Sequence, residues 1–175
     1  MRRTLDLAYI GLFAALTAVC AQITVPAAVP FTLQTLALFL AVGLLGWKRG
    51  ILAMAVYLGI GALGVPVFSG LGGGLGVLVG PTGGFLWSFL PAALVMGLIM
   101  GREPSLLRTV LGMAAGLLCV YAMGALWFAL WHIKEEAAME AGAVFSLTVL
   151  PFLVPDGAKI ALAALLAHKL RRHLK

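Results

Sequence analysis

Two long blocks of the sequence carry no charged side chain, and they limit the possible folds more than any other feature. They run from Leu7 to Trp47 and from Ile51 to Gly101. A transmembrane helix needs about 20 predominantly apolar residues, so each block is long enough for about two membrane crossings. With 63% hydrophobic and 10% charged residues, the chain has too little polar surface to cover a soluble globule. The sequence therefore predicts an integral membrane protein.

Turn-forming residues divide the apolar sequence into six expected helices. The breaks fall at Pro26 and Pro30, in a glycine-rich run, at Pro104, and in a stretch that contains glutamates. The expected spans are Leu5–Val25, Thr32–Gly46, Gly50–Gly64, Gly83–Gly101, Leu106–Trp131 and Ser146–Leu170. The first resembles a signal peptide but lacks a small-residue cleavage site, so we expect it to be retained. Because no stretch resembles a soluble linker, we expect residues 1–175 to form a single all-α, six-helix membrane domain.

The positions of Lys and Arg predict the orientation of these helices. If the N-terminus is cytoplasmic, ten basic residues fall on the inner side and one, Lys134, falls in an outer loop. The inner residues are Arg2, Arg3, Lys48, Arg49, Arg102, Arg108, Lys169, Arg171, Arg172 and Lys175. Because Lys and Arg concentrate on the cytoplasmic side of membrane proteins, we expect both termini to be cytoplasmic. Topology and anionic membrane lipid explain the net charge of +6, so we expect no nucleic-acid partner.

The connection between the third and fourth expected helices is unusual for an outer loop. It reads VPVFSGLGGGLGVLVGPTGG, from Val65 to Gly84, and carries no charge. Irregular backbone at membrane depth is tolerated only where protein or a cavity covers it. We therefore expect this stretch to fold back over the outer mouth of the helices. A disordered apolar loop is the alternative.

The sequence lacks the common motifs of an enzyme. There is no GxxxxGK[ST] loop to hold nucleotide phosphates and no HExxH metal motif. The three histidines lie at helix ends and in the basic tail, without the spacing of metal ligands. We therefore expect no catalysis, no metal and no cofactor, and we expect any ATP-driven step to need a partner.

The last expected span contains an acid and a base. Asp156 precedes Lys169 by 13 residues, which places it roughly 20 Å from the inner face of a ~30 Å hydrocarbon core. Asp156 and Lys159, at i and i+3, share a helix face and can contact each other or a common ligand. Pro155 and Gly157 flank the acid, so we expect the helix to start afresh or to kink there. Charges at this depth normally line a site, so we expect a polar ligand that enters from outside. An internal ion pair between helices and a proton relay are the alternatives.

A second polar cluster stands at the outer start of the second expected helix. Thr32, Gln34 and Thr35 interrupt an apolar run there. The Gln34 amide offers two donors and an acceptor, which suits an amide-like or urea-like ligand. By topology, this end of the helix and Asp156 face the same side. Apolar walls for a shared pocket could come from Phe31, Phe68 and Phe85, although ordinary packing is the alternative.

Four stretches together resemble the BioY family, the biotin-specific S components of energy-coupling factor (ECF) transporters. They read PFTLQTLALFLAVGLLGWKRG (30–50), YLGIGALGVPVFSG (57–70), GPTGGFLWSF (80–89) and PFLVPDGAKI (151–160). The resemblance runs over nearly the whole chain. It implies a six-helix protein of the prokaryotic plasma membrane that captures biotin in an outward-facing pocket. It also implies partners, namely a transmembrane T component and two cytosolic ATPases.

The resemblance further implies roles for particular residues. Asp156 and Lys159 match the Asp and Lys of the family's PxDxxK element, which belongs to the biotin site, and the loop between helices three and four closes over the ligand. Ala14 and Ala18 match an AxxxA pattern that docks S components to the T component, although ordinary helix packing uses the same spacing.

Biotin suits the residues themselves, because it offers two ureido N–H donors, a carbonyl acceptor, an apolar bicycle and a carboxylate. Asp156 could accept the ureido hydrogens, while Lys159 could neutralise the acid or contact the ligand. Two other functions remain open. One is an S component for a different vitamin, and the other is a proton-coupled secondary transporter that uses Asp156. A membrane protein with a purely structural role is the remaining alternative.

Overall fold

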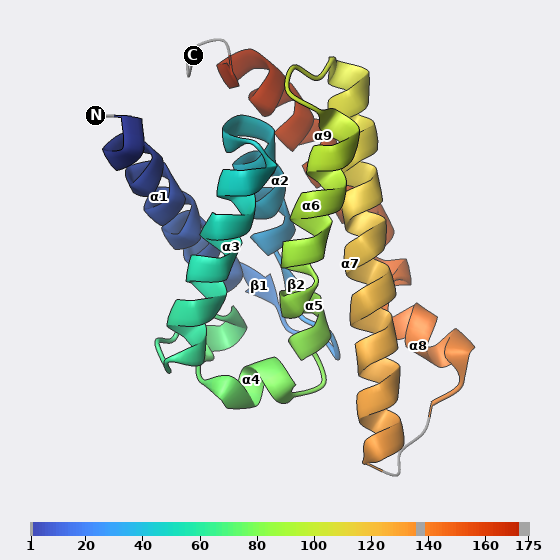
Figure 1. Cartoon of the computed structure of the whole chain (residues 1–175). Coiled ribbons are helices and arrows are strands. Elements are labelled where there is room, and N and C mark those ends of the chain that lie inside the picture. The colour runs from blue at the N-terminus through green and yellow to red at the C-terminus, as the bar shows by residue number, and fades with distance from the viewer. Residues whose placement is uncertain (1, 136–138, 172–175) are drawn as a thin grey trace.

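The computed structural model describes residues 2–135 and 139–171, and Figure 1 shows their arrangement. Within these ranges the chain is almost entirely helical. The long helices are α1 (Arg2–Gln22), α2 (Gln34–Leu45), α3 (Trp47–Ala62), α6 (Phe89–Met100), α7 (Leu106–Lys134) and α9 (Leu153–Leu170). The short ones are η1 (Ser69–Leu71), α4 (Leu75–Val79), α5 (Gly83–Trp87), α8 (Ala141–Thr148) and η2 (Leu150–Phe152). A hairpin of β1 (Thr24–Val25) and β2 (Phe31–Thr32) joins α1 to α2.

Helices that are apolar over their whole circumference dominate the described ranges. Four helical stretches are long and apolar enough to cross a membrane: Arg3–Gln22, Gly83–Met100, Leu106–Lys134 and Ala141–Leu170. α2 is apolar but shorter. Large apolar side chains point away from the bundle, as with Leu7 and Leu98, each 70% exposed. Such all-round hydrophobicity is typical of helices in lipid, and the chain is therefore an all-α membrane protein.

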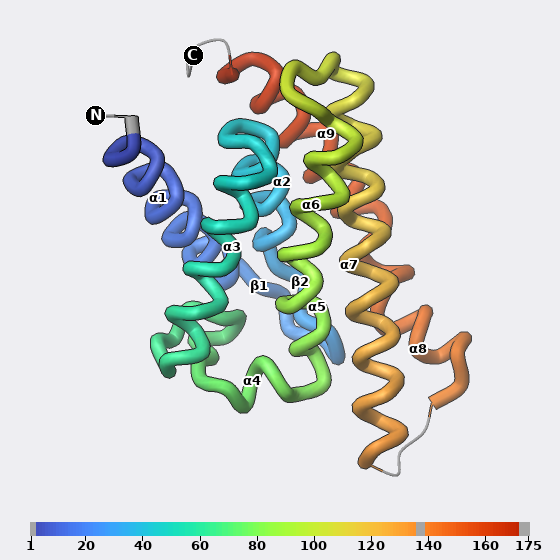
Figure 2. Tube along the Cα trace, in the orientation of Figure 1, coloured from blue at the N-terminus to red at the C-terminus, as the bar shows by residue number. Residues whose placement is uncertain are grey.

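Small residues allow the helices of the bundle to pack closely. α6 and α7 run side by side (Figure 2), and a Cβ atom at Gly112 or Gly116 of α7 would overlap the side chain of Met100 or Met96. Residues spaced as small-xxx-small let two helix backbones approach each other in lipid. These glycines therefore fix how α7, which carries part of the pocket described below, lies against α6.

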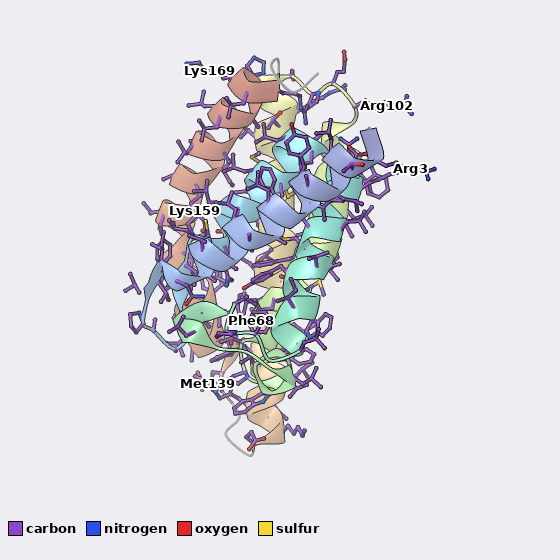
Figure 3. All side chains as sticks on the ribbon, turned by 90° about the vertical axis from the view of Figure 1, so that its left-hand side faces the viewer. Arg3, Phe68, Arg102, Met139, Lys159 and Lys169 are labelled. Carbon is purple, nitrogen blue, oxygen red and sulfur yellow. The ribbon has the colours of Figure 1, made fainter. Side chains whose placement is uncertain are left out.

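The two ends of the bundle differ in charge. Both described chain ends lie at one end of the bundle, and Figure 3 places Arg3, Arg102 and Lys169 there. Phe68 and Met139 lie toward the opposite end, with Lys159 between the two groups. Two of the expected inner charges, Arg172 and Lys175, lie outside the described residues. The distribution of the described basic residues is the one that a positive-inside topology produces.

The expected span Ser146–Leu170 is divided in the structure. α8 ends at Thr148, Val149 adopts a non-helical conformation (φ −127°, ψ −54°), and α9 begins at Leu153. Pro151 explains the interruption, because proline lacks an N–H group and clashes with the carbonyl of the preceding turn. Pro155 falls in the first turn of α9, where proline is tolerated. Asp156 therefore also lies in the first turn of a new helix.

The connection between α1 and α2 is more ordered than expected from its prolines. Thr24 pairs with Thr32 and Val25 with Phe31 in an antiparallel register. The backbone N–H of Leu33 also donates to the carbonyl of Cys20, at 3.2 Å, which holds the hairpin against the end of α1. The hairpin brings Thr32 and the start of α2 toward the centre of the bundle.

Candidate functional site

The acid and the base of α9 form a buried ion pair. Nζ of Lys159 lies 2.6 Å from Oδ1 of Asp156, and the two residues are 6% and 3% exposed. The i, i+3 spacing on one helix produces this contact. Asp156 also lies in the first turn of α9, where the helix dipole favours a negative charge. A buried pair needs further hydrogen bonds to offset the loss of hydration.

The hairpin and α2 supply those hydrogen bonds to the lysine. Lys159 Nζ donates to the Thr32 carbonyl at 2.6 Å and to the Thr35 hydroxyl at 3.0 Å. The Thr35 hydroxyl in turn donates to Oδ1 of Asp156 at 3.1 Å. An ammonium group has three N–H donors, and Asp156, Thr32 and Thr35 use all three. The lysine is therefore saturated by protein acceptors.

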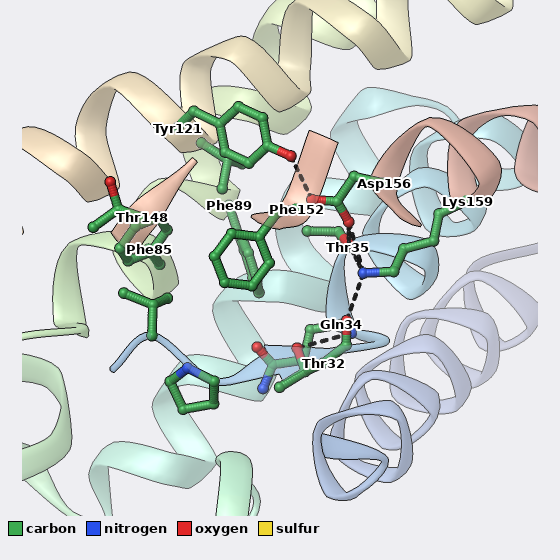
Figure 4. Close-up of a pocket in the computed structure, with 13 residues that line it drawn as sticks. Thr32, Gln34, Thr35, Phe85, Phe89, Tyr121, Thr148, Phe152, Asp156 and Lys159 are labelled. Atoms are coloured by element: carbon green, nitrogen blue, oxygen red, sulfur yellow. Dashed lines mark hydrogen bonds and ion pairs between the residues drawn. The ribbon is translucent and has the colours of Figure 1, made fainter. Parts of the chain in front are cut away.

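The second carboxylate oxygen of Asp156 is bound by a residue of α7. The hydroxyl of Tyr121 donates to Oδ2 at 2.7 Å (Figure 4). A carboxylate has about four acceptor positions, and the protein uses three of them, through Lys159, Thr35 and Tyr121. Asp156 thus retains about one position for a donor that approaches from outside the protein.

A pocket of about 440 Å³ opens beside this network. Its polar lining comes from Thr32, Gln34, Thr35, Tyr121, Thr148, Asp156 and Lys159, and its apolar lining comes from Val29, Pro30, Phe85, Phe89, Val120 and Phe152. A mostly apolar cavity with a few fixed polar groups is typical of small-molecule sites. The lining suits a small organic ligand with N–H donors.

Gln34 lines this pocket, and its side chain is held by a hydrogen bond to Tyr57 of α3. It is 6% exposed, and its Nε2 donates to the Tyr57 hydroxyl at 2.9 Å. The Tyr57 hydroxyl donates to the carbonyl of Val67 at 3.2 Å. This chain of hydrogen bonds fixes the amide of Gln34 and connects the pocket to the glycine-rich segment 65–84.

The three phenylalanines expected as pocket walls occupy different places. Phe85 lines the pocket directly. Phe68 lines an adjoining cavity of about 470 Å³, which shares Thr32, Gln34 and Phe85 with the first. Phe31 is outside the lining of both cavities and supports the site from behind. Its ring lies 4.1 Å from Lys159 Nζ and stacks on Phe152 with centroids 6.2 Å apart, so a cation–π contact adds to the stabilisation of the ammonium.

Two groups of contacts hold the glycine-rich segment 65–84. At its start, Gln22 of α1 donates from Nε2 to the Phe68 carbonyl and accepts at Oε1 from the Leu71 N–H, both at 3.0 Å. The ring of Phe68 fills a slot beside Gly61, where an added Cβ atom would overlap it. The segment is therefore fixed to α1 and α3 on one side of the adjoining cavity.

Two indole groups hold the later part of the same segment. Trp87 Nε1 donates to the carbonyl of Leu78 at 3.2 Å, and Trp127 Nε1 donates to the carbonyl of Gly80 at 2.9 Å. Trp127 belongs to α7, which also carries Tyr121. α7 therefore contacts both the carboxylate of the pocket and the segment 65–84.

The small residues expected to dock a partner line a groove between α1 and α3. Ala14 is 4% exposed and Ala18 is half-buried. They share a groove of about 590 Å³ with Gly11, Tyr57 and Val67, among others. The groove thus has α1 as one wall, and it also contains the two residues, Tyr57 and Val67, that connect to Gln34 of the pocket.

Sequence analysis did not identify Tyr121 or Thr148 as site residues. Tyr121 lies in a long apolar helix, where a tyrosine is ordinarily part of the packing. Its distance along the chain from Asp156 is 35 residues, so local spacing does not connect them. A tyrosine hydroxyl deep in an apolar span is itself a signal, because such a group needs a hydrogen-bond partner.

Comparisons with known proteins agree closely with each other. The model of the BioY family matches residues 1–175. The chain is 40% identical over 163 residues to the biotin transporter BioY of Thermotoga maritima, covering 93% of each chain. It is also 40% identical over 167 residues to the probable biotin transporter BioY of Pyrococcus horikoshii, covering 95% of this chain and 96% of that one. The crystal structure of the S component for biotin from an ECF-type ABC transporter has the same fold. The TM-score is 0.86 at 22% identity, covering 98% of this chain and 93% of the other.

Proposed function

The chain belongs to the BioY family, and we infer that it is the biotin-binding S component of an ECF-type ABC transporter. It is a multi-pass membrane transport subunit and not an enzyme. The observation that carries the assignment of the site is the Asp156 carboxylate. It is buried, oriented by three protein donors, and retains an acceptor position beside a pocket with apolar and polar lining.

Asp156 is the group that we propose accepts an N–H of the ureido ring of biotin. Lys159 is saturated by Asp156, Thr32 and Thr35, so its role is to pair with the acid and hold it in place rather than to donate to the ligand. Of the two roles that its spacing leaves open, these contacts support the one toward the acid. A hydrogen bond to a charged acceptor contributes about 1.5–3 kcal/mol, so the ureido contact supplies a substantial part of the affinity.

The remaining lining suits the other parts of the ligand. Phe85, Phe89 and Phe152 offer apolar surfaces for the bicyclic ring system. The Gln34 amide is fixed by Tyr57, and its position in the lining lets it contact the polar edge of the ring. The adjoining cavity, which reaches Phe68 and Ser69, gives space for the side chain of biotin that ends in the carboxylate.

We propose that the chain forms a single domain of six membrane spans, built from α1, α2, α3, α5 with α6, α7, and α8 with α9. Both termini are then cytoplasmic, because the basic residues Arg3, Arg102 and Lys169 share one end of the bundle. The segment 65–84 lies toward the opposite, outer end and closes over the ligand. Its hydrogen bonds to Gln22, Trp87 and Trp127 support this role.

An ATP-driven transport step requires partners, because the sequence has no nucleotide-binding motif of its own. We propose that a transmembrane T component docks at α1 along Ala14 and Ala18, and that two cytosolic ATPases drive the complex. The groove between α1 and α3 supports this docking site, since its small residues allow a close helix approach. Membrane lipid covers the other apolar faces.

Titration calorimetry of biotin into purified, ligand-free protein tests the function. We expect tight one-to-one binding to the natural protein. Losing a hydrogen bond to a charged acceptor costs about 1.5–3 kcal/mol, so Asp156→Asn should weaken binding by about 10- to 150-fold. No binding to a folded natural protein would contradict the assignment of biotin. A change of less than about tenfold in a folded Asp156→Asn variant would instead contradict the assignment of the site.

A further inference from the structure

Another cavity lies at the end of the bundle that holds both described chain ends. It has a volume of about 1210 Å³ and opens to solvent. Three parts of the chain form it, namely the turn between α2 and α3, the turn between α6 and α7, and the end of α9. None of its lining residues lines the pocket at Asp156. We call it the basic cavity.

Positive charge is the main chemical property of the basic cavity. Its charged lining residues are Lys48, Arg49, Arg102 and Arg171. Two acidic neighbours offset part of this charge. Asp6 pairs with Arg49 at 2.9 Å, and Glu103 interacts electrostatically with Arg171. Among the described residues, four positive charges less two negative ones leave an excess of two, so the cavity favours an anion.

Packing between the helices gives the basic cavity a fixed shape. Trp47 of α3 packs directly against Gly97 of α6, where an added Cβ atom would overlap the indole. The guanidinium of Arg171 donates to the Gly43 carbonyl of α2 and so anchors the end of α9. The turns pass through Gly46 and Gly101, with φ of 83° and 68°, conformations that favour glycine. The charged residues therefore lie on backbone that is held in place by packing between the helices.

Apolar surface adjoins the positive charges. Leu44, Leu45 and Trp47 line the same cavity, and Lys48 Nζ lies 5.4 Å from the centre of the Trp47 ring. A site with an apolar part and a cationic part suits a molecule that has an apolar part and an anionic part. In the membrane, that molecule is an anionic phospholipid, because basic pockets at the cytoplasmic side between helices hold such head groups.

We propose that the basic cavity binds the head-group phosphate of an anionic membrane lipid. Lys48 and Arg102 are the principal donors, since Arg49 and Arg171 already contact protein acceptors. The acyl chains lie along Leu44 and Leu45 and continue over the apolar outer surface of the helices. The site is separate from the ligand pocket and does not depend on biotin as the ligand.

Native mass spectrometry of the delipidated full-length protein tests the proposal. The probes are phosphatidylglycerol and phosphatidylcholine with identical acyl chains, and inorganic phosphate is the competitor. The test variant is Lys48→Gln with Arg102→Gln. The matched control is Arg3→Gln with Arg108→Gln, which removes two exposed charges outside the basic cavity. Thermal unfolding establishes that each variant is folded.

We expect the natural protein to bind phosphatidylglycerol at least about tenfold more tightly than phosphatidylcholine. The test variant should lose about tenfold or more of that affinity, and the control should keep it. Equal affinity for the two lipids would overturn the proposal, as would equal losses in both variants. Displacement of the lipid by millimolar inorganic phosphate would overturn the proposal that the ligand is a lipid. It would identify a site for small anions instead. Because biotin is absent throughout, failure here leaves the proposed transport function untouched.

Discussion

The hydroxyl of Tyr121 lies 2.7 Å from Oδ2 of Asp156, although the two residues belong to different helices. With Lys159 and Thr35 on Oδ1, this contact fixes the plane of the carboxylate. A ligand donor then meets an acceptor that is already oriented, so binding does not require the acid to lose rotamer freedom. Tyr121 is thus a positioning residue for the acid that we assign to the ligand.

Tyr121→Phe should weaken biotin binding while leaving the protein folded. Loss of one hydrogen bond to a charged group costs about 1.5–3 kcal/mol, and we expect the affinity to fall by roughly 5- to 30-fold, because part of the loss also affects the ligand-free protein. Calorimetry with biotin measures the effect. Tyr9→Phe is the matched control, since it makes the same chemical change on α1, away from the pocket lining. Equal affinities for the two variants would contradict the positioning role.

The ion pair of α9 predicts non-additive effects on stability. Lys159→Met leaves a buried carboxylate without its counter-ion and should destabilise the protein by about 3–5 kcal/mol. Adding Asp156→Asn removes that charge, so the double variant should recover much of the loss. Reversible unfolding of the two single variants and the double variant measures the coupling. Additive losses would show that the two side chains do not act as a pair.

Gln22 should control how fast the ligand leaves if the segment 65–84 closes the pocket. Its side chain both donates to Phe68 and accepts from Leu71. Gln22→Ala removes both hydrogen bonds, each of which contributes about 0.5–1.5 kcal/mol. We expect biotin to dissociate several-fold faster, with little change in the association rate.

Gln22→Glu is the informative companion variant, because it keeps the acceptor for Leu71 and loses the donor to Phe68. Because it also places a carboxylate oxygen against the Phe68 carbonyl, its dissociation rate should be at least as fast as that of Gln22→Ala. Stopped-flow release of a labelled biotin measures the rates. An unchanged rate in both folded variants would show that this end of the segment does not limit release.

Two glycines of α3 provide a matched test of the Phe68 slot. An alanine at Gly61 would overlap the Phe68 ring, whereas an added Cβ atom at Gly59 has nothing within 4 Å. Gly61→Ala should therefore destabilise the protein by about 1–3 kcal/mol through overpacking. Gly59→Ala should be neutral or stabilise it by up to about 1 kcal/mol. Thermal unfolding of the two variants decides the matter, and a similar shift for both would contradict the close packing seen at Gly61.

Local chemistry made several parts of the structure predictable. Long apolar blocks indicated membrane helices, and the i, i+3 spacing placed Lys159 beside Asp156, because helix geometry alone sets that distance. Pro155 and Gly157 indicated a fresh start or a kink at the acid, whereas the interruption lies a few residues earlier, at Pro151, and Pro155 falls in the first turn of α9. These inferences required only neighbours within one or two turns.

The sequence indicated that the polar start of the second expected helix and Asp156 face the same side, but not which side chains meet across the helices. The partners Tyr121 and Thr35 reach Asp156 from α7 and α2, and their approach depends on how these helices dock. The same limitation applies to Phe31, which supports Lys159 from behind instead of lining the pocket. The β1–β2 hairpin was missed because its two short strands pair across prolines, which indicated only a break.

The hydrogen bonds from Trp87 and Trp127 to the segment 65–84 give the protein an internal optical reporter. Two of its four tryptophans donate directly to carbonyl groups of that segment. Indole emission depends on the polarity and hydrogen bonding around the ring, so any displacement of the segment changes the natural fluorescence. If the segment opens and closes as proposed, the movement can be followed in real time in the unlabelled protein, in a detergent micelle or in a lipid bilayer.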